Sequence, residues 1–302
     1  MIASIQHISV CICTYKRPEL LALSLSKLET QETENLFNYS IFVVDNDSMQ
    51  SARQTVKSFS ERSKITIEYL VETEKNIALA RNKAVKNSKG SFIAFIDDDE
   101  FPQKDWLIRL YKAILKFGAD GVLGPVKPFF TVEAPKWILK GRFCERESFK
   151  TGTILHKAKH TRTGNVLFRK EVFEEGCTLF NPIFGKTGGE DVDFFERVMQ
   201  RGRIFVWCDE GAVFEVVPEE RLTRAYFVKR ALLRGVANAR KTRKMDFDVI
   251  KSAGAFMIYS MLLPILIFAR HDIFMKYLTK DCDHIGKLLA ICGVRLVKER
   301  GF

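Results

Sequence analysis

The chain has 302 residues, of which 46% are hydrophobic and 28% charged, and its formal net charge is +11. This composition excludes a disordered chain, and the length suffices for one large α/β domain with an appendage. The positive charge points to anionic partners, such as nucleotides, nucleic acid or an acidic membrane surface. Seven cysteines without a C-x-x-C pair favour reduced thiols in a cytosolic setting.

The first part of the chain alternates between short apolar runs and amphipathic segments. Its predicted strands lie around residues 8–13, 41–44, 65–71 and 92–96, and its predicted helices at 18–28, 52–59 and 77–87. Asn76 is expected to cap the third helix. Because the strands are almost continuously apolar, they predict a mostly parallel sheet that helices cover on both faces.

Four acids, Asp97 to Glu100, directly follow the strand predicted at 92–96. Adjacent carboxylates repel one another, so they are best tolerated at the exposed carboxyl end of a strand, beside a counter-ion. A hard divalent cation such as Mg²⁺ or Mn²⁺ prefers oxygen ligands of this kind. The alternative is an acidic turn that caps a helix beginning near Pro102.

Polar residues also follow the first two predicted strands, at Thr14-Tyr15 and at Asp45-Asn46-Asp47. The carboxyl ends of parallel strands line a shared crevice, which is where open α/β sheets bind ligands. No G-x-G-x-x-G follows the first strand, which argues against a dinucleotide site of the Rossmann type. Turn chemistry is the alternative role for Thr14 and Asp45.

The pattern changes after Pro125. Residues 126–162 lack clear periodicity and are expected to form a variable insert over the site, before a strand resumes at 164–168. A second acidic cluster then opens a helix running to about Gln200, and it comprises Glu190, Asp191, Asp193 and Glu196. Capping a helix needs one or two acids, so four of them favour a functional role for at least one.

The last third of the chain is basic and then apolar. Residues 221–244 carry nine Lys and Arg and no acid, and residues 252–269 carry no charge at all. This combination is typical of a segment that binds an anionic membrane surface, as a monotopic or re-entrant hairpin. A spanning helix and a buried helix are the alternatives. The predicted divisions are 1–125, 126–220 and the tail 221–302.

Taken together and in order, several motifs resemble the family-2 inverting glycosyltransferases with the GT-A fold, which is a Rossmann-like, mostly parallel sheet with helices on both faces. The subgroup that they resemble builds bacterial exopolysaccharides of the succinoglycan type. The motifs are Cys13-Thr14-Tyr15-Lys16-Arg17-Pro18, Val43-Val44-Asp45-Asn46-Asp47-Ser48, Asn76-Ile77-Ala78-Leu79-Ala80-Arg81-Asn82, Phe95-Ile96-Asp97-Asp98-Asp99-Glu100 with Pro102 and Trp106-Leu107, Gly164-Asn165, Gly189-Glu190-Asp191-Val192-Asp193-Phe194, and Arg221-Leu222-Thr223.

The resemblance implies a role for each matching position. Residues 1–125 would bind the nucleotide sugar, and 126–220 would hold the acceptor and the catalytic base, which is Asp191. Metal ligands would be Asp99 and Asp97, and Glu215 stands where many relatives have His. The remaining candidates are Thr14, Tyr15, Arg17, Asp45, Arg81, Asp97 and Asp98 for the nucleotide sugar, and Glu190, Asn165 and Glu215 as acceptor or secondary residues.

The implied reaction is metal-dependent transfer of a hexose, with Mn²⁺ or Mg²⁺, from a nucleotide-diphosphate sugar, in most relatives UDP-linked. The acceptor would be a saccharide or a lipid-linked saccharide in cell-surface polysaccharide synthesis, at the cytoplasmic face of the bacterial inner membrane. No nucleic acid partner is expected, and the oligomeric state stays open. Two alternatives remain: a sugar-phosphate nucleotidyltransferase, and a non-enzymatic basic protein that binds membranes or nucleic acid. The second does not account for the polar and acidic strand ends.

Overall fold

The computed structural model describes residues 5–174, 179–186, 188–239, 247–268 and 270–294. The chain divides into two compact units. The first contains the chain up to Phe129 together with Arg146–Val216, and the second contains Phe130–Glu145 together with the chain from Val217 onward. The functional divisions predicted at residues 125 and 220 stay predictions.

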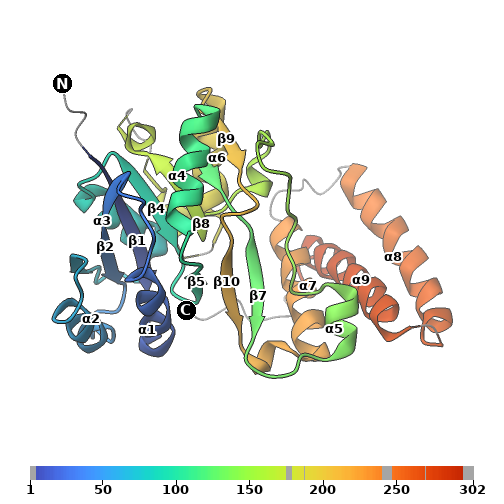
Figure 1. Ribbon diagram of the computed structural model, residues 1–302. Helices are drawn as coiled ribbons and strands as arrows, with labels where there is room; N and C mark the ends of the chain where they lie inside the picture. The colour runs from blue at the N-terminus through green and yellow to red at the C-terminus, as the bar shows by residue number, and fades with distance from the viewer. Residues whose placement is uncertain (1–4, 175–178, 187, 240–246, 269, 295–302) are drawn as a thin grey trace. The chain divides into compact units, whose positions relative to one another are not determined.

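Two sheets form the first unit (Figure 1). The larger has seven strands: β1 (Gln6–Thr14), β2 (Phe37–Asp45), β3 (Ile67–Val71), β4 (Phe92–Ile96), β6 (Gly121–Leu123), β8 (Asn165–Arg169) and β9 (Phe205–Trp207). Their order in space is β3-β2-β1-β4-β8-β6-β9. The smaller sheet has the order β5-β10-β7, from β5 (Glu100–Pro102), β7 (Val126–Phe130) and β10 (Val213–Val217).

The large sheet is mostly parallel, as the sequence predicts. β1 pairs in parallel with β2 and β4, β2 with β3, and β6 with β9. β8 runs antiparallel to both β4 and β6, with Asn165 opposite Ile96. The start of β8 therefore lies at the same edge of the sheet as the carboxyl ends of β1, β2 and β4.

Helices cover both faces of this sheet. They are α1 (Pro18–Leu28), α2 (Arg53–Ser60), α3 (Ile77–Asn87), α4 (Trp106–Phe117) and α6 (Glu190–Gln200), with short 3₁₀ turns η1 (Ala158–His160), η2 (Lys170–Phe173) and η3 (Pro182–Phe184). Side chains alternate along a strand, so Val10 enters the core under α1 and α4 while Cys11 enters the core under α3 and α6. Because helices bury both faces of the sheet, its strands are apolar along almost their whole length.

The third helix confirms the predicted cap. The side chain of Asn76 accepts hydrogen bonds from the backbone N–H groups of Ala78 and Leu79. The helix predicted to begin near Pro102 instead begins at Trp106, because Pro102 is the last residue of β5 and lies opposite Val213. The acids at 97–100 therefore do not cap this helix.

Residues 126–162 are more ordered than their irregular pattern predicts. They contain β7, α5 (Lys136–Gly141) and η1, and residues 130–145 belong to the second unit. Short elements of three to six residues are too brief to show a hydrophobic period, which is why the sequence pattern misses them.

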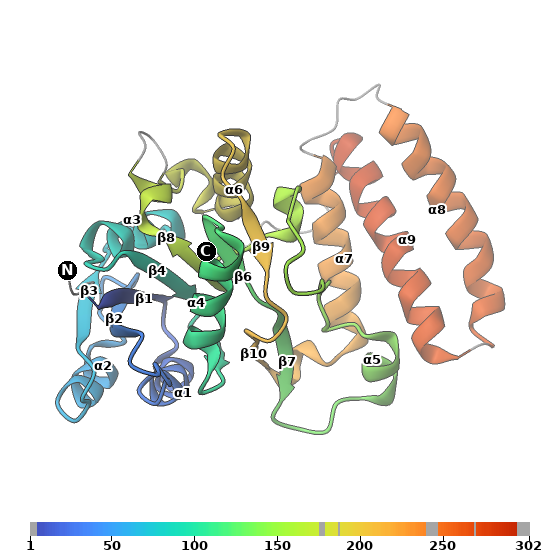
Figure 2. The ribbon, with the colours of Figure 1, turned by 45° about the horizontal axis from the view of Figure 1, so that its top comes forward.

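The described helices and turns of the second unit are α5, η4 (Glu219–Arg221), α7 (Arg224–Ala239), α8 (Phe247–Leu266) and α9 (His271–Ile291). α9 packs against α5, α7 and α8, and Figure 2 shows it between α7 and α8. Gly235 of α7 and Gly286 of α9 allow this approach, since a Cβ on either would lie about 2 Å from backbone oxygen of the other helix.

The apolar segment 252–269 falls largely within α8. Of the described helices, α8 alone is long and apolar enough to cross a membrane, and only 6% of its apolar window is buried inside the structure. Met257, Met261 and Ile265 are 63%, 75% and 68% exposed. The spanning, re-entrant and buried alternatives for this segment stay predictions. Exposed apolar side chains at this density are typical of a surface that contacts a membrane or another molecule.

Candidate active site

The site lies at the carboxyl edge of the large sheet, where β1 and β4 run side by side. Thr14, the last residue of β1, donates a hydrogen bond of 2.9 Å to the Asp98 carboxylate, which follows β4. Arg17 donates to Asp98 and to Asp99, both at 3.1 Å. Four candidates from two distant stretches of the chain therefore form one network.

The carboxylates of this network crowd one another. Burial, together with the charges of Asp97 and Asp98, raises the pKa of Asp99 to about 6. Burial is also the main cause of the raised pKa of Asp98, although Arg17 and Thr14 act in the opposite direction. Asp97 is more open, with 45% of its side chain exposed. The site thus holds excess negative charge that a bound cation would relieve.

Arg81 of α3 joins the first acidic cluster to the second. It is 7% exposed, forms an ion pair with Glu190 at the start of α6, and its Nη2 lies 3.6 Å from the Asp97 carboxylate. Asp191 is the next residue of α6 and is half-buried. Its negative charge interacts with the Arg81 guanidinium. Arg81 therefore brings together two acidic clusters that lie about 100 positions apart in the chain, while the predicted roles of base and metal ligand stay untested.

Glu100 and Glu215 extend the acidic region onto the small sheet. They lie opposite each other in the antiparallel pair of β5 and β10. Arg146 forms an ion pair with Glu215, and its Nη1 is 4.0 Å from Glu100. Glu100 is 1% exposed, and burial together with Asp97 raises its pKa well above the usual range. Glu215 therefore lies in the site, paired with an arginine.

Gly164 brings the beginning of β8 against these carboxylates. A Cβ at this position would lie 2.7 Å from an oxygen of Glu100 and 2.9 Å from one of Asp97. Such distances are shorter than van der Waals contact, so a larger residue would displace the acids. A glycine is required here by close approach, since its backbone is not in the left-handed region.

Two of the predicted acceptor or secondary residues, Asn165 and Glu190, make buried contacts within the chain. Asn165 is fully buried, donates to the backbone oxygens of Pro125 and Gly211, and accepts from the Trp106 indole at 2.8 Å. Its side chain therefore links three segments of the fold. Glu190 is buried against Arg81 and holds that guanidinium. The predicted assignment of both as acceptor or secondary residues stays untested.

Asp45 is also fully buried. Its carboxylate accepts hydrogen bonds from the backbone of Asp47 and Ala52 and from the Tyr69 hydroxyl, at 2.8 to 3.0 Å. These hydrogen bonds stabilise the turn between β2 and α2. Stabilising a turn is the alternative role that the sequence suggests for Asp45. The predicted contact between Asp45 and a uracil ring stays untested.

Tyr15 is half-buried beside two lysines. The Lys75 ammonium lies 4.4 Å from the centre of its ring, and the Lys16 ammonium lies 5.3 Å from it. An aromatic face with cations around it suits a flat, anion-bearing ligand such as a nucleotide. The predicted place of Tyr15 near the base stays untested.

The carboxylates of the site fit a divalent cation that is bound partly by the protein and partly by the phosphates of a substrate. Within the described ranges, no three His, Cys, Asp or Glu side chains gather as a complete cage. Mg²⁺ and Mn²⁺ do not require one, because they are commonly bound by one or two carboxylates plus substrate phosphates and water. Asp97, which is half-open, and Asp99, whose charge is destabilised by its neighbours, are the carboxylates suited to this role.

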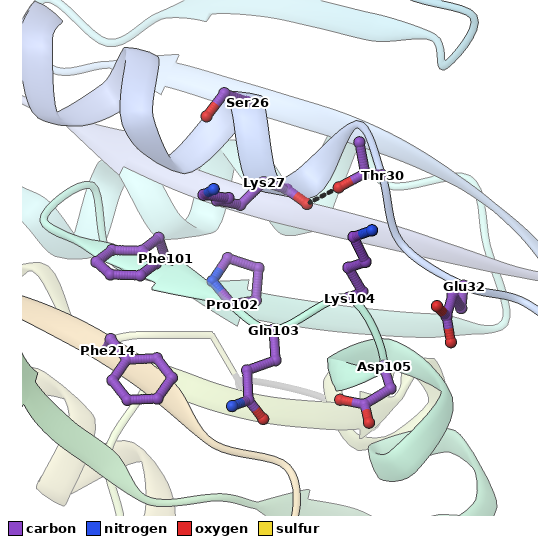
Figure 3. Close-up of a pocket in the computed structure, with 10 residues that line it drawn as sticks. All are labelled: Ser26, Lys27, Thr30, Glu32, Phe101, Pro102, Gln103, Lys104, Asp105 and Phe214. Carbon is purple, nitrogen blue, oxygen red and sulfur yellow. Dashed lines mark hydrogen bonds between the residues drawn. The ribbon is translucent and has the colours of Figure 1, made fainter.

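A separate groove of about 640 Å³ lies on the other side of the small sheet. Figure 3 shows Phe101 and Phe214 at one end of it, with Lys27, Lys104 and Asp105 around its rim. Side chains alternate along β5 and β10, so these rings point away from the face that carries Glu100 and Glu215. The groove is therefore distinct from the carboxylate site.

Sequence reasoning misses Glu100, Arg146 and Arg162 as members of the site. The sequence does contain a signal for Glu100, because it is the last acid of the run at 97–100 and begins a strand. Arg146 and Arg162 lie in the segment without periodicity, where no local pattern singles out one arginine from another. Only the pairing of β5 with β10 and the placement of β8 bring them to the acids.

The mostly parallel α/β sheet, with one acidic cluster at its carboxyl edge and a second joined to it through Arg81, has the architecture of glycosyltransferases with the GT-A fold. The model of the family described as "Glycosyl transferase family 2" matches residues 9–177, more than half of the chain. The chain belongs to glycosyltransferase family 2 and is a glycosyltransferase.

Individual relatives agree with this assignment. The chain is 31% identical over 303 residues to the succinoglycan biosynthesis protein ExoM of Rhizobium meliloti, covering 98% of this chain and 96% of that protein. It is 27% identical to the glycosyltransferase AglE of Haloferax volcanii, covering 67% and 64% of the two chains. The structure of S. aureus TarS 1–349 in complex with UDP-GlcNAc superposes with a TM-score of 0.57 at 15% identity, covering 96% and 93%, and shows a shared fold.

Proposed function

We propose that this glycosyltransferase moves a hexose from a UDP-sugar to a hydroxyl of a saccharide or lipid-linked saccharide, with inversion and with a divalent cation. The observation that carries the proposal is the bridge formed by Arg81, which joins Asp97 to Glu190, the neighbour of Asp191. A base and a diphosphate site within one pocket are what direct displacement at an anomeric carbon needs. The relatives named for polysaccharide synthesis support the acceptor class.

Asp191 is the base in this proposal. An alcohol is a weak nucleophile, so a positioned carboxylate that removes its proton contributes about 10²–10⁴-fold. The acceptor oxygen bonds to the anomeric carbon, the bond from that carbon to the diphosphate breaks, and its electron pair leaves with UDP. Attack from the face opposite the leaving group inverts the configuration. The proton ends on Asp191.

Asp99 and Asp97 would hold Mn²⁺ or Mg²⁺, and a bound cation would stabilise the charge on the departing diphosphate by several kcal/mol. At the nucleotide end, Tyr15 offers a ring face, while Thr14 and Arg17 fix Asp98 in place. We assign Asp98 to the ribose on this basis. Asp45 acts here by holding the turn that follows β2, whether or not it also reaches the base.

Release of UDP tests this function directly. Purified protein is incubated with a panel of UDP-sugars and candidate acceptors, with Mn²⁺, with Mg²⁺ and with EDTA. We expect release from at least one UDP-sugar that requires the metal and rises on adding a saccharide acceptor. Equal release in EDTA would contradict the metal requirement, and release of pyrophosphate from a nucleoside triphosphate with a sugar phosphate would instead indicate nucleotidyl transfer.

We further propose that the second unit binds an anionic membrane surface at the cytoplasmic face, as a peripheral or monotopic segment. α8 presents an exposed apolar surface, and α7 in the same unit contributes Arg224, Lys229, Arg230 and Arg234. Each Lys or Arg near an anionic surface adds about 1 kcal/mol of attraction. A lipid-linked acceptor would be reached at that surface. Part of the predicted basic run, residues 240–246, lies outside the described residues.

Vesicle flotation is expected to show this binding. The protein should float with vesicles rich in phosphatidylglycerol and much less with neutral phosphatidylcholine vesicles, because both charge and apolar area contribute. A double change of Met261→Glu and Ile265→Glu on α8 should abolish flotation while UDP binding persists. The matched control is Met49→Glu, which alters an equally exposed methionine in the first unit and should float like the parent.

A further inference from the structure

Four arginines surround the carboxylates of the site, and three of them have carboxylate partners. Arg17 pairs with Asp98 and Asp99, Arg81 with Glu190 and Asp97, and Arg146 with Glu215. The fourth is Arg162. Within the described part of the chain, no carboxylate lies at ion-pair distance from its guanidinium.

Arg162 lies on the segment that passes from one acidic cluster to the other. The segment begins at η1, which packs against α6, and it ends at Gly164, which lies against Glu100 and Asp97. Thr161 and Thr163 are 3% and 1% exposed, while Arg162 between them is half-buried. Because Arg162 is more exposed than the threonine on either side, its side chain is not taken up by the core that buries them.

The charges around Arg162 place it beside both clusters. The groups that act on it are Arg146, Asp191, Glu100 and Asp97, and burial with the charge of Arg146 lowers its pKa. A partly buried guanidinium is costly without a counter-ion, and its five N–H donors match the oxygens of a phosphate. No described residue supplies a carboxylate at ion-pair distance from Arg162. The counter-ion that fits this guanidinium is therefore an anionic group of the substrate.

We propose that Arg162 binds the β-phosphate of the nucleotide sugar and stabilises it as the leaving group, an inference that rests on the proposed function. When the anomeric carbon–oxygen bond breaks, the electron pair stays on the β-phosphate oxygen, so its negative charge increases. A cation beside that oxygen is then bound more strongly than in the ground state. The alternative source of an anion is a carboxylate on the donor sugar, as in a uronic acid.

Comparing UDP with UMP isolates the β-phosphate. Calorimetric affinities for UDP, UMP and UDP-glucuronic acid are measured for the parent, Arg162→Gln and Arg162→Lys, each with Mn²⁺ and again in EDTA. A charge-assisted hydrogen bond of ordinary strength corresponds to about 10- to 100-fold in affinity. We expect Arg162→Gln to weaken the affinity for UDP by that factor while the affinity for UMP is unchanged. Arg162→Lys should lose less of the affinity for UDP.

The matched control is Arg109→Gln, a surface arginine of α4 that pairs with Asp105. Its UDP and UMP affinities should equal those of the parent. Unchanged UMP binding in Arg162→Gln also shows that the variant is folded. Equal losses for UDP and UMP, or no loss for either, would overturn the inference, as would a loss confined to UDP-glucuronic acid. A parent protein that binds neither nucleotide would overturn the proposed function itself.

Discussion

Replacing Asp191 by asparagine is expected to lower turnover about 10²–10⁴-fold while the affinity for the UDP-sugar stays within about twofold of the parent. The amide has nearly the same size but cannot accept the proton of the acceptor hydroxyl. Donor binding should persist because the residues that would hold the nucleotide, Thr14, Tyr15 and Arg17, lie at the end of β1 and just after it, away from α6. Turnover and donor affinity are measured separately, by product formation and by calorimetry.

Asp193→Asn provides a matched control on the same helix. Asp193 pairs with Arg197 one turn further along α6, at 2.9 Å, and its loss should leave turnover within about twofold. Transfer by Asp191→Asn at the parent rate would remove Asp191 from the mechanism. A loss of donor affinity as large as the loss of turnover would show that Asp191 holds the donor instead.

Replacing Asp99 by asparagine is expected to have two effects of opposite sign. Metal-stimulated transfer should fall at least about 100-fold. The reason is that losing an oxygen ligand weakens binding of the cation, which would stabilise the transition state by several kcal/mol. The metal-free protein should at the same time become more stable at pH 8, by on the order of 1–3 kcal/mol. The reason is that burial and the charges of Asp97 and Asp98 disfavour an ionised Asp99.

The pH dependence follows from the same shift. The pKa of Asp99 is about 6 in the folded protein, above its ordinary value of 3.8, so the folded state binds this proton more tightly than the unfolded state. Between these two values the free energy of unfolding of the metal-free parent should rise as pH falls. Asp99→Asn should lack this contribution. Denaturant unfolding in EDTA from pH 5 to pH 8 measures the difference.

Asp120→Asn is the matched control for stability. Asp120 also pairs with an arginine, Arg203, at 2.8 Å, but it lies away from the acidic clusters. Its replacement should lower stability at pH 8, which is the opposite sign. A destabilised Asp99→Asn variant would mean that the ion pair with Arg17 outweighs the repulsion, and full Mn²⁺ stimulation of that variant would exclude Asp99 as a metal ligand.

The elements that sequence predicts well are those whose cause is local. The apolar run at 92–96 is β4, residue for residue, and the helix after Asn76 spans Ile77–Asn87 because its cap is an adjacent side chain. The second acidic helix ends at Gln200 as predicted. The family, the fold class and the glycosyltransferase assignment likewise follow from motifs whose order in the chain is visible without coordinates.

The roles within the site depend on contacts that span the chain, and the sequence by itself does not contain them. Asn165 is a buried link between three segments, and Glu190 serves Arg81, although both stand in motifs of a binding site. Conversely, Arg146 and Arg162 come from a stretch without pattern.

Local sequence patterns are enough to predict the longer strands and helices of the first unit and the two groups of acids, because periodicity and capping act over a few residues. Tertiary structure alone decided which carboxylate meets which arginine. An ion pair depends on distances of a few ångströms between residues up to 109 positions apart, and only the packed sheet sets those distances.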